Sequence, residues 1–512
     1  MAELLAIAGC LAAATLAAIR WLRIVQRDQY YNAAVRFGRR WWFGVPLNLV
    51  LAGFGLAGAL FAPLTPWAAL LTAAAVAIGP LGLGLRGRTA PLAWSRRMVR
   101  LAIVLVATNA VVLLVVTGLA VVLALDPLHA VTVAAAGVAL LQPLVVDLAA
   151  TLSRPLERRL MATFVDRASR RLAQVSPTVV AITGSYGKTS TKGYVTHLLG
   201  ASRPVVPSPA SYNNTGGLAR AINEHLAPGT DVFVAEMGTY GPGEIRELCS
   251  WIKPDVAVLT AIGPVHLERM GSLDNIVRAK SEIFERAETC VINVDAHRLA
   301  EVADRLARDK VVWRCSERDA TADVHVVTQD GQLRVTLRGR HVATFERPGT
   351  QPINVACAVA VAGALGLAEE HIAARLPTLP SAAHRLQVAS ATNGATVIDD
   401  TYNSNPAGFR AALATLLALP AQRRAVVTPG MIELGPQQAA ENEELARAAA
   451  GAVDDLLVVN RTNRAALLAG AQGGRARVHV FDRRDQAVAW VRSNLGPGDA
   501  VLYENDLPDT YP

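Results

Sequence analysis

The sequence predicts an N-terminal α-helical membrane domain followed by two α/β domains. Three observations support this fold class. Long apolar stretches fill the first 150 residues of a chain whose hydrophobic fraction is 52% and whose mean hydropathy is +0.29. A glycine-rich loop stands directly between an apolar strand and a helix after residue 177. Short apolar strands then alternate with helical stretches, which is typical of α/β domains.

Five apolar stretches are long enough, or nearly so, to cross a bilayer as helices, since a span needs about 20 apolar residues. They cover residues 4–25, 45–64, 66–85, 101–125 and 128–150. The first is the weakest, because Arg20 and Arg23 interrupt its end, and we expect these long side chains to reach the membrane interface. Asp147 lies near the end of the last stretch, where a solvated interfacial acid is favoured over a functional group.

Arginine residues are distributed unevenly among the connecting segments. Loops 26–44 and 86–100 and the segment after residue 150 are rich in arginine, whereas the links near Pro63 and Asp126 hold neither Lys nor Arg. By the positive-inside rule, the N-terminus is outside and everything after residue 150 is cytoplasmic. We therefore expect a multi-pass protein of the cytoplasmic membrane that contacts membrane lipid.

Charge and cysteine usage disfavour several other classes of protein. Residues 1–172 hold 17 Arg, no Lys and 6 acidic residues, a net charge of +11, whereas the rest of the chain carries −3. The basic character therefore belongs to the membrane-flanking segments and does not indicate a nucleic-acid partner. The five cysteines form no C-x-x-C pair, which disfavours a disulfide framework or a zinc site and suits a reducing compartment.

Residues 177–200 predict a phosphate-binding loop between a short buried strand and a helix. The loop is Gly184-Ser185-Tyr186-Gly187-Lys188-Thr189-Ser190. Its glycines let backbone N–H groups turn toward a phosphate, and the helix N-terminus adds partial positive charge. Lys188 would contact the β- and γ-phosphates of a nucleotide, and Thr189 would ligate Mg²⁺. The alternative is an ordinary glycine-rich turn.

Seven segments in order resemble the motifs of the Mur ligase family over roughly residues 175–505. They are Ile182-Thr-Gly-Ser-Tyr-Gly-Lys-Thr-Ser190, Tyr212-Asn-Asn214 with Gly216, Ala235-Glu-Met-Gly238, Gly263-Pro-Val-His-Leu-Glu268, Ala279-Lys-Ser-Glu-Ile283, Ile398-Asp-Asp-Thr-Tyr-Asn-Ser-Asn-Pro406 and Gly430-Met-Ile-Glu-Leu-Gly435. The resemblance implies an ATP-dependent, ADP-forming ligase that makes an amide bond through an acyl phosphate. The motifs are most similar to those of members that add D-alanyl-D-alanine to a cell-wall precursor, so this dipeptide is the default amine.

The resemblance also implies a metal set. Glu236 ends an apolar strand and would bind Mg²⁺ together with Thr189, while His266 would bind a second Mg²⁺. Family members carbamylate the lysine that corresponds to Lys280 with CO2, which turns a cation into an anion able to help hold metal. The alternatives are a solvated acid at Glu236, a structural histidine at His266 and a surface lysine at Lys280.

The remaining site residues follow from the same resemblance. Besides the loop 184–190, the residues expected to bind ATP are Asn354, Arg385 and Asp400, with Asn354 near adenine. The residues expected to face the two substrates are Asn213, Asn214, Tyr402, Asn403 and Asn405. The catalytic set would be Lys188, Lys280, His266 and Asn214. Turn chemistry is the alternative at Asn213 and Asn214, and a helix cap is the alternative at Asn354.

We expect three domains, covering residues 1–172, 173–348 and 349–512. The middle one is the P-loop domain, which should end in a β-hairpin over residues 324–345 that turns at Asp330-Gly331. The last is a Rossmann-like domain, since short strands alternate there with helical stretches. Closure of the last domain onto the P-loop domain would exclude water from the acyl phosphate.

Two features depart from the family pattern. Family members usually begin with a soluble domain that grips the UDP of the acceptor, whereas this chain begins with membrane stretches. The acceptor carboxylate is then either lipid-linked, or the spans are a plain anchor. The family's Lys-Gly-Ser after the last strand is replaced by Glu504-Asn505-Asp506, which favours a different acceptor or amine. A polyglutamate-type or other envelope amide ligase, a membrane NTPase or transporter, and an inactive scaffold are the alternatives.

Overall fold

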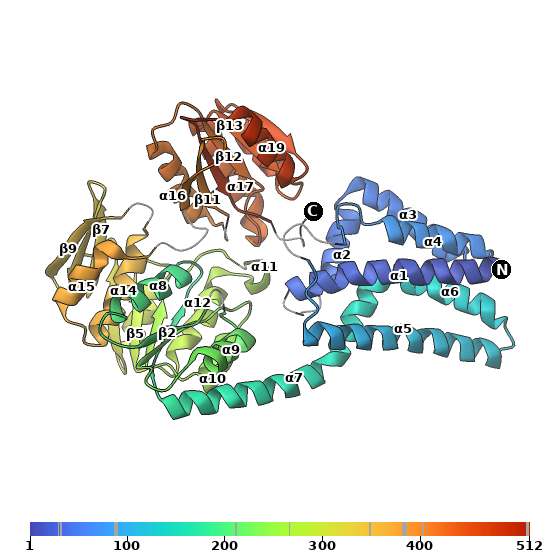
Figure 1. Ribbon diagram of the computed structural model, residues 1–512, viewed down its shortest axis with the longest axis horizontal. Helices are drawn as coiled ribbons and strands as arrows, with labels where there is room; N and C mark the ends of the chain where they lie inside the picture. Colours follow the sequence, from blue (N-terminus) through green and yellow to red (C-terminus); the bar gives the residue numbers. More distant parts are fainter. Residues whose placement is uncertain are drawn as a thin grey trace. The chain divides into compact units, whose positions relative to one another are not determined.

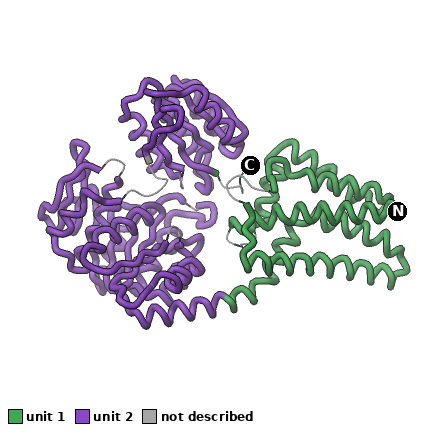
Figure 2. Tube along the Cα trace, in the orientation of Figure 1, with its two compact units in different colours: residues 1–160, 507–512 green, residues 161–506 purple. Residues whose placement is uncertain are grey.

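The computed structural model describes residues 1–28, 30, 33–85, 91–209, 212–265, 267–347, 350–380, 387–401, 404–507 and 511. The chain divides into two compact units (Figure 2). Unit 1 holds residues 1–160 with 507–512, and unit 2 holds residues 161–506.

Unit 1 is helical over the residues that are described. Its helices are α1 (Ala2–Arg27), α2 (Ala34–Phe43), α3 (Pro46–Phe61), α4 (Pro66–Ile78), α5 (Arg96–Val122), α6 (Pro127–Leu140) and the first part of α7 (Gln142–Val175). Figure 1 shows α1, α3, α4, α5 and α6 running roughly side by side. The helical character of this region agrees with the sequence prediction.

Helix length and composition identify some of the five expected membrane spans, and the number five stays a prediction. In the part of the chain that is described, α1 and α5 are long and apolar enough to cross a membrane. The pairs α2–α3 and α6–α7 are bent by 109° and 80°, and counting each pair as one broken span raises the number to four. Helix α4 has 13 residues. It is therefore about 20 Å long, shorter than the roughly 30 Å hydrocarbon core.

Arg20 and Arg23 do not reach outward as expected but are buried inside unit 1. The Arg20 guanidinium donates to the carbonyl oxygens of Val76 (3.0 Å), Ala77 (2.6 Å) and Gly79 (2.7 Å), at the C-terminal end of α4. Arg23 donates to Gly84 O at 2.5 Å. A helix leaves its last carbonyls unpaired and carries partial negative charge there, so an arginine from a neighbouring helix satisfies both requirements.

We expect Arg20→Ala to destabilise unit 1, because it leaves several carbonyls without a donor at about 1–3 kcal/mol for each one that stays buried. Thermal unfolding of the full-length protein in detergent measures the effect, with the exposed Arg27→Ala in the same helix as the control. Equal melting temperatures for the two variants would contradict this role of Arg20.

Asp147 is a helix-capping residue, so the solvated acid expected there is wrong. Its side chain is 8% exposed. Its two carboxylate oxygens accept from the N–H groups of Ala34 and Val35, each at 3.0 Å. These N–H groups belong to the first turn of α2, where helical N–H groups lack intrahelical partners. Asp147 therefore fixes the start of α2 against α7.

The first sheet of unit 2 has nine strands in the order β2-β3-β1-β4-β5-β6-β7-β8-β9. They are β1 (Thr178–Thr183), β2 (Val205–Pro207), β3 (Val232–Glu236), β4 (Val256–Leu259), β5 (Thr289–Asn293), β6 (Val311–Ser316), β7 (Val324–Gln329), β8 (Gln332–Leu337) and β9 (Arg340–Glu346). Strands β1 to β7 pair in parallel, whereas β7, β8 and β9 are antiparallel. The expected hairpin is confirmed at β7–β8, where Asp330 and Gly331 both have positive φ (50° and 77°), as a tight hairpin turn requires.

Helices cover both faces of this sheet. They are α8 (Lys188–Leu199), α9 (Thr215–His225), α10 (Glu244–Trp251), α11 (Leu267–Met270), α12 (Leu273–Ser281), α13 (Leu299–Leu306), α14 (Pro352–Ala364) and α15 (Glu369–Arg375), with the short 3-10 helices η1 (Glu282–Phe284) and η2 (Leu376–Thr378). One buried apolar cluster joins α8 and α14 to one face, and a second joins α9, α10 and α13 to the other.

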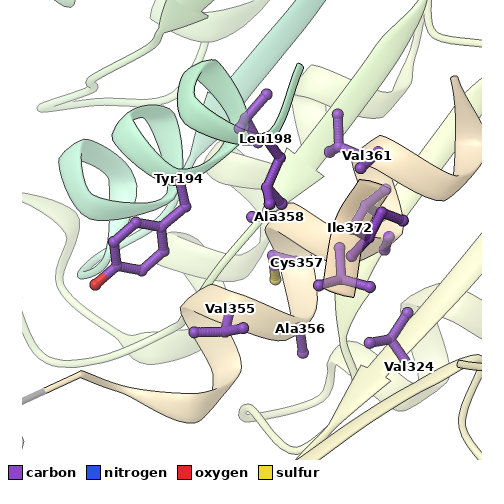
Figure 3. Packing of buried hydrophobic residues seen from close by; sticks show 14 of the residues in the cluster. Tyr194, Leu198, Val324, Val355, Ala356, Cys357, Ala358, Val361 and Ile372 are labelled. Carbon is purple, nitrogen blue, oxygen red and sulfur yellow. The ribbon is translucent and has the colours of Figure 1, made fainter. Parts of the chain in front are cut away.

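The boundaries between packed units do not fall at the residues 172 and 348 that the sequence predicts. Unit 2 begins at Met161, and Ala168 of α7 already lies in its core. Helix α14, expected in the last domain, packs on the first sheet instead: Figure 3 shows Tyr194 and Leu198 of α8 close to Ala358 of α14. Its alanine-rich surface permits this close helix packing, and the shared core continues to Leu379.

The second sheet has six strands in the order β10-β11-β15-β12-β13-β14 and confirms the second α/β domain. The strands are β10 (Gln387–Ser390), β11 (Thr396–Asp400), β12 (Arg424–Thr428), β13 (Asp455–Val459), β14 (Arg477–Phe481) and β15 (Ala500–Glu504). All are parallel except β10. The helices are α16 (Pro406–Ala418), α17 (Gln438–Ala452), α18 (Arg464–Ala471) and α19 (Arg484–Asn494), with the 3-10 helix η3 (Gly435–Gln437).

Candidate functional site

The loop between β1 and α8 has the backbone that a phosphate-binding loop needs. Gly187 precedes α8 with φ +80°, and a Cβ there would lie 2.1 Å from Asn354 Oδ1. Gly184 has φ +155°, and its Cβ would lie 2.0 Å from Thr260 Oγ1. Both positions therefore require glycine, as a loop whose backbone closely approaches a phosphate does.

Ser185 fastens this loop to the segment after β4. Its N–H donates to Ala261 O at 2.8 Å, and its hydroxyl bonds to both the N–H and the carbonyl of Gly263 at 3.0 and 3.1 Å. Thr260 donates to the carbonyl of Tyr186 at 2.5 Å. Helix α8 begins at Lys188 directly after the loop, and the first-turn N–H groups of a helix are the usual donors to a phosphate.

Glu236 lies beside the loop because β3 pairs with β1 in a register that sets Glu236 opposite Ile182. Its carboxylate accepts from Thr189 Oγ1 (3.0 Å) and Asn213 Nδ2 (3.4 Å) and pairs with Lys192 Nζ (3.0 Å). The side chain is 2% exposed, so it is not a solvated strand-end acid. The hydroxyl of Thr189 and the carboxylate of Glu236 are hard oxygen donors, and this pair fits Mg²⁺.

Lys192 was not singled out by the sequence, although the signal was present. It follows Lys188 by four residues on α8 and so lies on the same face of the helix. Its ion pair with Glu236 is almost fully buried, at 7% and 2% side-chain exposure. Lys192 therefore holds the carboxylate of Glu236 in place at the edge of the loop.

Lys280 reaches the same loop from the end of α12. Its Nζ donates to Gly184 O at 3.2 Å, and Lys188 Nζ donates to that oxygen at 2.7 Å. Burial lowers the pKa of Lys280 well below its usual range, and the nearby Lys188 charge lowers it further. A buried lysine on the P-loop is not a surface lysine, and the lowered pKa favours the neutral amine.

The asparagines divide into two groups. Asn213 lies against Gly238 and donates to Glu236, which brings it to the loop. Asn354 is not a helix cap, since α14 starts at Pro352, and its side chain lies against Gly187. Asn214 and Asn405 each cap the start of a helix. The N–H of Gly217 donates to Asn214 Oδ1, and the N–H of Gly408 donates to Asn405 Oδ1, each at 2.9 Å. Turn and cap chemistry is thus present at Asn214, and its substrate role stays a prediction.

Of the other expected site residues, the structure describes some and not others. Asp400 ends β11 and is 8% exposed. His266, Arg385, Tyr402 and Asn403 lie outside the described residues, so their roles stay predictions. Gly435 packs against the backbone of Leu267 and Glu268, which brings the motif 430–435 next to the motif 263–268.

The segment 504–506, where the family has Lys-Gly-Ser, is bonded internally. Glu504 accepts from Thr428 Oγ1 at 2.5 Å, Asn505 Nδ2 donates to Gly430 O at 2.6 Å, and Asp506 pairs with Arg484 at 2.5 Å. Glu504 is fully buried. Burial, together with the negative charge of Asp400, raises its pKa to about 8. These contacts make the segment a support for the loop at Gly430.

We expect Glu504→Gln to stabilise unit 2 at pH 8 by a few kcal/mol, and Glu370→Gln, at an exposed position, to change little. The folded pKa of Glu504 (about 8) is above the unfolded value, so folding takes up a proton between about pH 4.5 and 8. The stability of the native protein therefore falls as pH rises through this window. Thermal unfolding at pH 5 and pH 8 checks it, and a Gln variant with the wild-type pH slope would contradict the assignment.

A glycine loop at the carboxyl end of a parallel sheet, with an oxygen pair that fits Mg²⁺ and a buried lysine beside it, is typical of enzymes that use ATP for phosphoryl transfer. The Mur ligase middle domain matches residues 182–364, and the Mur ligase, glutamate ligase domain matches residues 384–503. This chain belongs to the Mur ligase family and is an ATP-dependent, ADP-forming amide ligase.

Individual relatives agree. A UDP-N-acetylmuramoyl-tripeptide–D-alanyl-D-alanine ligase from Mycobacterium bovis is 35% identical over 363 residues, which cover 64% of this chain and 69% of the relative. A crystal structure of MurF from Acinetobacter baumannii has 25% identity and a TM-score of 0.60, covering 68% of this chain and 77% of that one. MurF from Thermotoga maritima in complex with ADP has 26% identity and a TM-score of 0.57, with coverages of 68% and 80%.

Proposed function

We propose that this protein joins D-alanyl-D-alanine to the carboxylate of a muramoyl-tripeptide precursor at the cytoplasmic face of the membrane. The name and identity of the Mycobacterium bovis relative support this substrate pair. The observation that carries the proposal is the convergence of Lys188, Lys280 and the Thr189–Glu236 pair on one phosphate-binding loop.

In the proposed reaction, an oxygen of the acceptor carboxylate attacks the γ-phosphorus of ATP, and the bond to the ADP oxygen breaks. The amine nitrogen then attacks the acyl carbon and loses a proton, while phosphate leaves with the former carboxylate oxygen. Lys188 and the N–H groups of α8 stabilise the charge on the transferring phosphoryl group. Thr189 and Glu236 would hold Mg²⁺, which neutralises phosphate charge when bound.

A second metal position would use His266 and a carbamate on Lys280. The lowered pKa of Lys280 supports this modification, because the neutral amine is the form that attacks CO2. The nitrogen of the neutral amine forms an N–C bond to CO2 and loses one proton, so that the buried neutral amine becomes an anion. Lys188 already lies on the same carbonyl oxygen and is a nearby positive charge for that anion.

We place unit 1 in the membrane as five spans with the N-terminus outside. His129 pairs with Glu3 at 3.4 Å and bonds to Pro63 O at 3.0 Å, so the start of α1, the α3–α4 link and the start of α6 meet. Arg20 and Arg23 bind the segment after α4, at the other end of α1. This alternation supports an up-and-down bundle whose arginine-rich loops share one side.

The experiment measures ADP release by the full-length protein in lipid nanodiscs with ATP, Mg²⁺ and a panel of acceptors and amines. We expect ADP release to require both D-alanyl-D-alanine and a muramoyl tripeptide. Activity on the UDP-linked acceptor alone makes unit 1 an anchor, whereas activity only on a lipid-linked tripeptide makes it part of acceptor binding. Glutamate as the preferred amine would contradict the dipeptide and favour a polyglutamate-type ligase.

A further inference from the structure

Unit 1 contains a groove of about 420 Å³ among α2, α3, α4 and the junction of α6 with α7. Leu49 and Leu56 of α3, Val76 of α4, and Leu140 and Leu144 at the junction line it. Among the lining residues that the structure describes, Arg39 is the charged one. The volume is within the roughly 300–1,000 Å³ of typical small-molecule sites, so the groove can hold part of a ligand.

Helix α2 sets one wall of the groove. Val35, Arg39 and Trp42 follow one another at spacings of four and three residues and all line the groove. The opposite face of α2, with Phe37 and Trp41, is buried in the bundle. Basic residues, tryptophans and a buried apolar face are typical of helices that lie at a membrane interface.

Arg39 differs from the arginine one turn earlier. Arg36 pairs with Asp28 at 3.1 Å, whereas Arg39 is exposed and has no ion-pair partner in the described part of the chain. An exposed cation next to a long apolar groove is complementary to an anion that is attached to a hydrocarbon chain. Exposed apolar residues of α3, such as Val50 and Phe54, continue the apolar surface beyond the groove.

We propose that this groove binds one hydrocarbon chain of an anionic membrane phospholipid, with the lipid's net negative head group against Arg39. The proposal rests on the membrane placement of unit 1 but not on the identity of the acceptor. A lipid bound selectively in this groove differs from the lipids that merely surround the spans, because the surrounding lipids have no preference for head-group charge at this one position.

The glycines offer matched variants. Gly53 lines the groove and has no atom within 4 Å of an added Cβ, so Gly53→Leu fills the groove without a clash at that atom. Gly118 of α5 is equally open but does not line the groove, so Gly118→Leu is the control. Arg39→Gln removes the charge.

The test uses full-length protein in phosphatidylcholine nanodiscs that contain a small fraction of a photoreactive lipid. This lipid is phosphatidylglycerol in one sample and phosphatidylcholine in the other, and both carry the photoreactive group in the hydrocarbon chain. Mass spectrometry then measures labelling of residues 34–61. We expect phosphatidylglycerol to label about fivefold more, with the preference lost in Arg39→Gln, the labelling reduced in Gly53→Leu, and both kept in Gly118→Leu. Equal labelling by the two lipids, or labelling indifferent to both groove variants, would overturn the site. Release of the protein from native membranes by alkaline carbonate would instead overturn the membrane placement.

Discussion

Lys280→Ala is expected to reduce the rate of amide formation by about 100-fold to 1,000-fold, the usual cost of removing one group that stabilises charge in the transition state. The buried amine lies on Gly184 O beside Lys188. Because burial lowers the pKa of Lys280, we expect it to carry a carbamate at neutral pH. Wild-type activity should therefore fall in CO2-free buffer and recover when bicarbonate is added.

The control for this prediction is Lys253→Ala, since Lys253 is exposed. It should keep wild-type activity and the wild-type response to bicarbonate. Carbon-13 NMR of protein equilibrated with labelled bicarbonate should show a carbamate signal that Lys280→Ala lacks. A wild-type enzyme that is indifferent to CO2 and shows no such signal would contradict the carbamate, whatever the activity of the variant.

Gly187→Ala is expected to weaken ATP binding and to reduce activity by about 100-fold or more, because small displacements of a positioning loop have effects of this size. The new Cβ would lie 2.1 Å from Asn354 Oδ1, and the backbone has φ +80°. Asn354 is buried and packs on the loop, so the contact must move one of the two. Calorimetric titration with ATP measures the loss.

Gly229→Ala separates backbone strain from the clash. Gly229 has φ +85° and nothing within 4 Å of an added Cβ. This control should therefore lose about 1–2 kcal/mol of stability from the left-handed backbone and keep its affinity for ATP. If both variants bound ATP as the wild type does, the loop would not be the nucleotide site.

Much of unit 2 could be predicted from the sequence because its signals are local. The strand, glycine loop and helix at 178–199 are contiguous, and the positive φ of Asp330 and Gly331 follows from their residue types. The motif acid Glu236 was placed correctly beside the loop, because parallel strands bring their carboxyl ends to one edge. Lys192 shows the limit: helical spacing puts it near Lys188, but only the fold brings it to Glu236.

The remaining features depend on partners that are distant in the sequence. Arg20 was expected at an interface, but its acceptors are on α4, more than fifty residues away. Asp147 was expected in water, but it caps α2, more than a hundred residues earlier. Helix α14 follows the hairpin and was assigned to the last domain, yet its small side chains let it pack on α8. The pattern of hydrophobic residues along the chain does not show which helix packs against which other helix or sheet.

The most direct test of the account follows the acceptor's own oxygen. The full-length enzyme is given ATP, D-alanyl-D-alanine and a muramoyl tripeptide whose reacting carboxylate is labelled with oxygen-18, and the released phosphate is analysed by mass spectrometry. An acyl-phosphate ligase transfers one labelled oxygen into each phosphate that accompanies amide formation. Unlabelled phosphate, produced from ATP at the same rate with or without the amine, would contradict the central claim that this protein is an amide ligase.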